Sequence, residues 1–210
     1  MRIYAIADIH GRDDREKRAI EFASSSDLAI VCGDITHFGP PQRARDFLDR
    51  IADKVETFAI PGNCDLWETV DEIKNSKAKS LHAEMIDFKG RTFFGFGGAV
   101  PGMIKTVFEN AEETVYEELS KVAVERGIMV THMPPRGHLD HTVHGSDIGS
   151  TSVLRVIEEK NPILDICGHV HEGVGTEVFG GTTIVNCSAG YRGYGCYIDI
   201  EDDVRVGFLG

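Results

Sequence analysis

Short apolar runs that end in a polar residue constrain this sequence more than any other feature. The clearest is Leu28–Cys32, five apolar residues that stop at Gly33 and Asp34. A run this short and this apolar is typical of a strand buried on both faces, as in a parallel sheet. Asp34 is then expected at the carboxyl end of the strand, where open α/β sheets collect functional groups. The alternative for Asp34 alone is a cap on the next helix.

Four more predicted strands end in residues that can bind a metal. Residues 3–7 lead to Asp8 and His10, residues 55–60 to Asn63, residues 128–130 to His132, and residues 163–167 to His169 and His171. Two residues separated by one position lie on the same side of an extended chain, so such a pair can hold one ion. For each residue alone, a turn or surface role is the alternative. Five strand ends with such ligands favour one shared site.

The remaining periodicity predicts helices and hairpins around these strands. Helices are expected over residues 13–24, 41–51, 66–74, 112–126 and 150–159, and hairpins over 85–94, 174–186 and 194–208. Alternating strands and helices imply parallel crossovers. We therefore expect an α/β fold of two packed sheets with helices outside, in a single domain of residues 1–210.

Composition excludes several classes of partner. The net charge of −12 argues against a nucleic-acid polymer or an anionic membrane as the main partner. No stretch approaches a transmembrane span, and the first residues pass directly into a strand, so no signal peptide is expected. Five cysteines lack framework spacing, and Cys32 and Cys167 lie inside apolar runs. A reduced, cytoplasmic setting fits this pattern.

Two metal sites with four ligands each need eight contacts. Seven candidate ligands are enough only if one of them binds both ions. They are Asp8, His10, Asp34, Asn63, His132, His169 and His171. A bridging carboxylate resolves the count, because its two oxygens can each bind one ion. Asp34 is the natural bridge. Mixed Asp, Asn and His ligands suit manganese, which we expect first, or iron, zinc or nickel.

The order of these blocks resembles the calcineurin-like metallophosphoesterase superfamily. The matching motifs are Asp8-x-His10, Gly33-Asp34, Gly62-Asn63, His132 and Gly168-His169-x-His171. The resemblance implies a four-layer α-β-β-α sandwich of two mixed sheets. It also implies that Asp8, His10, Asp34 and His171 hold one metal, while Asp34, Asn63, His132 and His169 hold the other. A metal-activated hydroxide would then attack the phosphorus of a small phosphate ester.

Cys64 departs from the family pattern, which has histidine after the asparagine. The Gly-Asn-Cys-Asp segment is similar to a small, single-domain prokaryotic branch that includes phosphodiesterases. The Gly-Asp-Ile-Thr-His segment of residues 33–37 is similar to the group related to cyclic-nucleotide phosphodiesterases. Asp34, Asn63, His37 and Cys64 are our candidate catalytic residues. Cysteine is a weak proton donor, so His37 or a histidine of residues 138–144 is the hypothesised acid.

A phosphodiester substrate is preferred because a diester needs fewer cationic groups than a monoester. A nucleotide is one candidate for this small phosphate ester. The candidate substrate-binding residues are Arg12, Arg136, Arg192 and Trp67, and Trp67 could stack on a base or sugar or simply lie in the core or rim. The alternatives are a monoesterase of the protein-phosphatase kind and a non-catalytic metal-binding scaffold. A homo-oligomer is compatible with the sequence.

Overall fold

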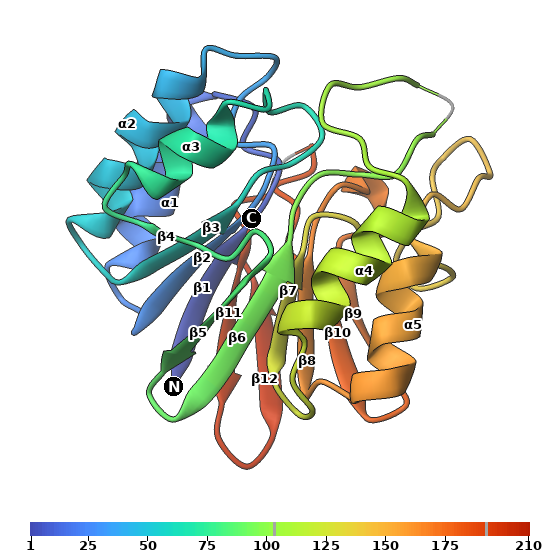
Figure 1. Ribbon diagram of the computed structural model, residues 1–210. Coiled ribbons are helices and arrows are strands. Elements are labelled where there is room, and N and C mark those ends of the chain that lie inside the picture. Colours follow the sequence, from blue (N-terminus) through green and yellow to red (C-terminus); the bar gives the residue numbers. More distant parts are fainter. Residues whose placement is uncertain (103, 192) are drawn as a thin grey trace.

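Two six-stranded sheets pack face to face, and helices cover both outer faces (Figure 1). The computed structural model describes residues 1–102, 104–191 and 193–210. Helices α1 to α3 lie on one side of the molecule, and α4 and α5 lie on the other. This arrangement confirms the predicted four-layer α-β-β-α sandwich.

The first sheet has the strand order β12-β11-β1-β2-β3-β4. Its strands are β12 (Val204–Phe208), β11 (Cys196–Ile200), β1 (Arg2–Ile6), β2 (Leu28–Cys32), β3 (Thr57–Ile60) and β4 (Lys79–Ser80). Strands β1 to β4 are parallel, and β11 joins β1 in antiparallel register. The connecting helices are α1 (Asp13–Ala23), α2 (Pro41–Ala52) and α3 (Thr69–Lys74).

The second sheet has the order β5-β6-β7-β8-β10-β9. Its strands are β5 (Glu84–Phe88), β6 (Arg91–Phe96), β7 (Ile128–Thr131), β8 (Leu164–Cys167), β10 (Thr182–Asn186) and β9 (Gly175–Phe179), with helices α4 (Glu112–Val122) and α5 (Thr151–Lys160) outside. The three predicted hairpins are confirmed. However, β10 also pairs in parallel with β8, whereas only antiparallel pairing was predicted for the strands after residue 174.

Alternating side chains divide the buried residues into three layers. In β1, Ile3 and Ala5 belong to the core between the sheets, whereas Tyr4 and Ile6 pack under α1 and α2. All five residues of β2 are buried, because this strand is covered on both faces. A third cluster lies between the second sheet and the pair α4 and α5. The apolar runs of the sequence are therefore strands enclosed by sheet and helix.

Two predicted helices are shorter in the structure. Helix α4 ends at Val122 rather than at residue 126, because the backbone of Ala123 is extended (φ −70°, ψ 128°) and Val124 packs against the core. Helix α3 begins at Thr69 rather than residue 66, and Trp67 lies in the turn before it. Elsewhere the predicted bounds differ by one or two residues. No helix of the described residues is long and apolar enough to cross a membrane.

The carboxyl ends of β1, β2, β3, β7 and β8 meet at one edge of the sandwich. The loops that follow them gather at the upper end in Figure 1. The two sheets share this edge, since Ala7 after β1 accepts a backbone hydrogen bond from Ala189 after β10. Polar residues from five strand ends are thus brought to one place.

Candidate metal centre

Seven polar side chains form one cluster at this edge. They are Asp8 and His10 after β1, Asp34 after β2, Asn63 after β3, His132 after β7, and His169 and His171 after β8. Asp8 and His132 are fully buried, and Asp34 and Asn63 are nearly so. These are the residues that the strand-end pattern predicted as metal ligands.

Asp8, His10 and His171 make up the first part of the cluster. Nε2 of His10 lies 3.3 Å from Nε2 of His171, which in turn lies 3.5 Å from Oδ1 of Asp8. One ligand atom from each residue falls within 4.8 Å of the other two. This spacing fits three ligands of one ion.

Asn63, His132 and His169 make up the second part. The Oδ1 atom of Asn63 lies 2.8 Å from Nε2 of His132 and 2.8 Å from Nδ1 of His169. The other ring nitrogen of His132, Nδ1, lies 2.7 Å from the backbone carbonyl oxygen of Cys32. That contact fixes the orientation of the ring and leaves Nε2 facing Asn63.

Asp34 lies between the two parts. Its Oδ1 atom is 3.4 Å from Nε2 of His132, and its Oδ2 atom is 3.8 Å from Nε2 of His10. The backbone N–H of Cys64 donates to Oδ1 over 2.8 Å. Each carboxylate oxygen therefore faces a different set of ligands.

The backbone at these positions is strained. Asp8, His10, Asp34 and His169 have φ values of 60°, 53°, 49° and 66°. Residues with side chains rarely adopt this left-handed region, and each such residue costs about 1–3 kcal/mol. Hydrogen bonds compensate, as when the N–H of His10 donates to the carbonyl of Asp34 over 2.8 Å. Strain of this kind clusters at functional sites.

Gly33 and Gly62 allow the turns after β2 and β3 to approach each other. A Cβ atom on Gly33 would lie 2.5 Å from Nδ1 of His132, and one on Gly62 would lie 2.1 Å from the backbone nitrogen of Asp34. Both contacts are shorter than real Cβ atoms make. The glycines that precede Asp34 and Asn63 in the sequence are therefore required for the close packing of the ligands.

Asp65, which does not follow a strand end directly and was not among the predicted site residues, connects these two turns. Its carboxylate is buried and accepts hydrogen bonds from the N–H groups of Ile35, Thr36 and Gly62 and from the hydroxyl of Thr36. The donors come from the segments that carry Asp34 and Asn63. Asp65 thus fixes the distance between the second and third strand ends.

Arg15 of α1 supports the first strand end and was also missed. Its buried guanidinium donates to the backbone carbonyl of Asp8 over 2.6 Å and to the carbonyl of Gly190. The sequence does not predict this role for Arg15, because both acceptors are backbone carbonyls of other segments.

Burial acts to raise the pKa of both carboxylates of the cluster, but their charged neighbours differ. Burial, together with the charges of Asp8 and Asp65, raises the pKa of Asp34 to about 7 although His132 opposes this. Burial also acts to raise the pKa of Asp8, but its contact with His171 over 3.5 Å and the charges of His132 and His171 bring this pKa below the ordinary value. Two carboxylates this close favour the presence of a cation.

The cluster fits divalent metal ions. Burial lowers the pKa of His10 to about 4 and that of His169 to about 3, so both imidazoles are neutral near pH 7 and have a free lone pair. Among the described residues, Oδ1 of Asp8 and Nδ1 of His10 are buried without a hydrogen-bond partner. Neutral imidazoles with carboxylate and amide oxygens form a donor set for a transition metal.

His37 and Cys64 lie next to the cluster. Ligand atoms of His10, His37 and Cys64 fall within 4.8 Å of one another, and the rings of His10 and His37 are 5.3 Å apart. Burial and the charge of Asp34 raise the pKa of the Cys64 thiol well above its usual range. The thiol therefore keeps its proton, whereas the side chain of His37 is exposed to solvent.

The predicted substrate-binding residues lie at the rim or outside the cluster. Arg12 follows His10 by two residues, but its exposed guanidinium pairs with Asp14 over 3.1 Å. Arg136 is exposed, and Trp67 is half exposed and stacked on Phe108. Arg192 lies outside the described residues.

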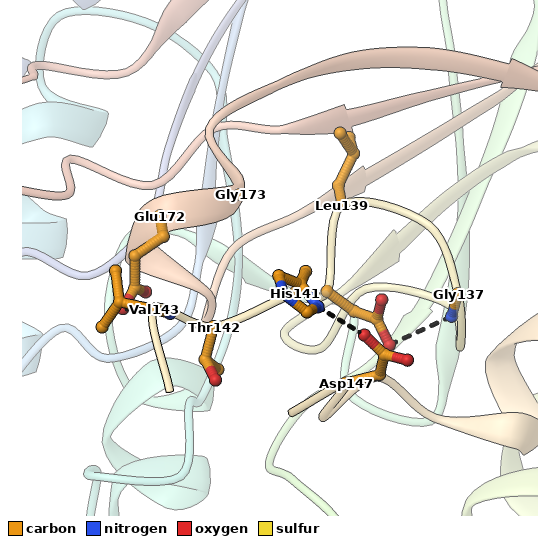
Figure 2. Close-up of a pocket in the computed structure, with 9 residues that line it drawn as sticks. Gly137, Leu139, His141, Thr142, Val143, Asp147, Glu172 and Gly173 are labelled. Atoms are coloured by element: carbon orange, nitrogen blue, oxygen red, sulfur yellow. Dashed lines mark hydrogen bonds and ion pairs between the residues drawn. The ribbon is translucent and has the colours of Figure 1, made fainter. Parts of the chain in front are cut away.

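The loop after β7 lines a pocket together with Glu172 and Gly173 (Figure 2). The pocket has a volume of about 450 Å³ and includes Glu172, the residue after His171. Within this loop His141 pairs with Asp147 over 2.8 Å, whereas His138 pairs with Glu177. These two histidines of the segment 138–144 therefore contact acidic partners rather than the cluster.

A match to one protein family shows to which family the chain belongs. The family described as calcineurin-like phosphoesterase matches residues 1–173. The chain belongs to this family. The uncharacterised protein MJ1162 of Methanocaldococcus jannaschii is 33% identical over 198 residues, which cover 90% of this chain and 88% of that protein. Membership makes the chain a metal-dependent phosphoesterase that hydrolyses small phosphate esters.

Solved structures share the fold at low sequence identity. TT1561 of Thermus thermophilus has a TM-score of 0.77 at 16% identity, over 100% of this chain and 99% of that chain. GAP50, described as the anchor in the inner membrane complex of Plasmodium, has a TM-score of 0.62 at 13% identity, over 99% and 84%. These likenesses show the α-β-β-α fold alone.

Proposed function

We propose that this phosphoesterase uses two divalent metal ions, bridged by Asp34, to hydrolyse phosphodiesters. The position of Asp34 carries the proposal. One of its oxygens faces His132 and the other faces His10, so a single carboxylate serves both ligand sets. Asp8, His10 and His171 would complete one site, and Asn63, His132 and His169 the other.

Manganese is the metal we propose first, because the donors combine carboxylate, amide and imidazole. Bound divalent ions lower the pKa of water and offset negative charge on a phosphoryl group. The protein residues supply the geometry. Asp65 and Arg15 hold the strand ends in place, and the contact between His132 and the Cys32 carbonyl orients the imidazole.

The preference for diesters is supported by the scarcity of free cationic side chains at the site among residues 1–102, 104–191 and 193–210. A monoester dianion carries one more charge than a diester, and this favours additional cationic side chains. Arg12 is already paired with Asp14, and Cys64 is a neutral thiol where the wider family has histidine. We propose that His37 donates the proton to the leaving group, since it is the exposed imidazole nearest to Cys64 and His10.

We also propose that residues 1–210 form one domain in a reducing, cytoplasmic setting. The last two strands, β11 and β12, complete the sheet that begins with β1. All five cysteines are free and buried, in keeping with a reduced environment.

The test begins with protein stripped of metal and refilled with manganese. It is assayed on bis(p-nitrophenyl) phosphate and on p-nitrophenyl phosphate, and the bound metal is counted. We expect two ions per chain, a higher kcat/KM for the diester, and loss of turnover in Asp34→Ala. A higher kcat/KM for the monoester would contradict the proposed substrate class. Two bound ions without turnover of either ester would favour a scaffold.

A further inference from the structure

Two half-exposed aromatic side chains, Phe38 and Trp67, lie on loops beside the metal centre. Phe38 is 47% exposed and Trp67 is 49% exposed. Single exposed apolar residues are ordinary on protein surfaces. These two differ, because each is connected through short contacts to a residue of the candidate centre.

Phe38 is connected to His10. The rings of His10 and His37 have centroids 5.3 Å apart, and those of His37 and Phe38 are 4.7 Å apart. The N–H of Phe38 donates to the carbonyl of Cys64 over 2.8 Å. Phe38 also has a φ of 59°, which is rare for a bulky residue, so the loop holds the backbone here in a specific conformation.

Trp67 is connected to Asn63. The carbonyl of Asn63 accepts the N–H groups of Val107 and Phe108 over 3.2 Å and 3.1 Å. Phe108 is fully buried, and its ring centroid lies 3.9 Å from that of Trp67, with 34° between the planes. A buried ring therefore supports the indole of Trp67, while about half of that side chain remains open to solvent.

The two aromatic loops also meet each other. A Cβ atom on Gly39, the residue after Phe38, would lie 3.2 Å from Cδ1 of Leu66, the residue before Trp67. The segments that carry the two exposed rings are thus in contact. The N–H of Phe38 donates to the carbonyl of Cys64, and Trp67 stacks on Phe108, whose N–H donates to the carbonyl of Asn63. Two exposed aromatic rings are thus carried by adjoining segments that contact the turn of Asn63 and Cys64, directly or through Phe108.

We propose that Phe38 and Trp67 bind a planar ring of the substrate, so that the enzyme prefers aryl or nucleoside phosphoesters to alkyl phosphoesters. The inference rests on the proposed function, because the ring is bound next to the phosphate at the metal centre. Aromatic rings stack on or pack edge-to-face against each other. Stacking on an aromatic side chain typically improves binding about 5- to 100-fold.

Trp67 is the sole tryptophan of the chain and reports on its own ligand. Manganese-loaded protein is titrated with adenosine 5′-monophosphate, phenyl phosphate and glycerol 3-phosphate, with tryptophan fluorescence excited at a wavelength that the nucleotide does not absorb. We expect ring-bearing ligands to change the emission and to bind at least about 5-fold more tightly than glycerol 3-phosphate. A response to adenosine monophosphate alone identifies a nucleobase site, and a response to phenyl phosphate identifies a general aryl site.

Phe38→Leu keeps the reporter and removes the second ring. It should weaken binding of the preferred ring-bearing ligand relative to glycerol 3-phosphate, whereas Phe208→Leu, a change at the 41% exposed Phe208 of β12, should not. Equal affinity for all three ligands would overturn the inference. Because binding is read from tryptophan fluorescence and not from product formation, that result with intact diester hydrolysis would leave the proposed function standing. Ring binding without hydrolysis of either ester would support this inference and contradict the proposed function.

Discussion

Nε2 of His10 lies 3.3 Å from Nε2 of His171, although 161 positions separate the two residues in the chain. Oδ1 of Asp8 adds a third ligand atom, 3.5 Å from Nε2 of His171. Burial lowers the pKa of His10 and keeps it neutral at pH 7, so this ring can present a lone pair to the space between the three side chains. Such convergence is what a bound cation requires.

Replacing either histidine should therefore remove one metal site and spare the other. We expect His10→Ala and His171→Ala each to bind about one manganese ion per chain where the native protein binds two. The measurement is metal content by mass spectrometry after gel filtration. His144→Ala, an exposed histidine of the loop after β7, is the matched control. Retention of two ions in both variants would contradict this assignment.

Asp65→Asn tests whether the two strand ends are positioned by one carboxylate. An amide keeps the size of the side chain but has one acceptor oxygen in place of two, so some of the four donors lose their partner. Each unsatisfied buried group costs about 1–3 kcal/mol. We expect denaturant unfolding to show a loss of that order, together with weaker manganese binding. Unchanged stability and unchanged metal affinity would exclude the role.

Asp165 of β8 should make stability depend on pH. Burial raises the pKa of this carboxyl to about 8, far above the ordinary value of 3.8, and Oδ2 has no hydrogen-bond partner among the described residues. Between these two pH values the folded state therefore binds more protons than the unfolded state. As a result, the free energy of unfolding of the native protein falls as pH rises through this range.

Asp165→Asn removes this dependence. The free energy of unfolding of the variant, minus that of the native protein, should increase from about pH 4 to about pH 8 and then level off. Chemical denaturation at each pH gives the difference, in which other titrating groups cancel. A difference that stays constant across this range would mean that Asp165 is ionised in the folded protein.

His37→Gln tests the proposed proton donor. The loss should depend on the leaving group: about 100-fold for an alkyl ester, which needs protonation, and little for p-nitrophenolate, which does not. The quantity measured is kcat/KM for a series of leaving groups, with His144→Gln as control. Equal losses across the series would assign His37 a role in binding instead.

Cys64→His tests the departure from the family pattern. An imidazole in place of the protonated thiol should raise kcat/KM for a phosphomonoester by about 10- to 100-fold, within the range of general acid catalysis. Cys64→Ser, which changes only the sulfur, should show no such gain. If both variants behave alike, the residue after Asn63 does not determine the preference between diester and monoester.

The strand-end ligands could be predicted because the information is local. Each is preceded by a buried strand, and a parallel sheet brings such ends to one edge, as Asp34 after β2 and His132 after β7 illustrate. The same holds for the turns at Gly90 and Gly180, where hairpins were predicted and are found.

The supporting residues could not be predicted, since their partners are distant in the sequence. Asp65 accepts hydrogen bonds from residues 29 and 30 positions away, and Arg15 reaches Gly190 across 175 positions. The early end of α4 has a similar origin, because Val124 leaves the helical path to pack against the core. These features follow from tertiary packing, which periodicity does not encode.

The bridging role of Asp34 is the central claim, and electron paramagnetic resonance of the manganese-loaded protein tests it most directly. Two manganese ions that share a carboxylate are magnetically coupled, so we predict a coupled spectrum from two ions per chain, replaced in Asp34→Ala by the spectrum of isolated ions. Two ions with an uncoupled spectrum in the native protein, or a coupled spectrum that persists in Asp34→Ala, would contradict the bridge.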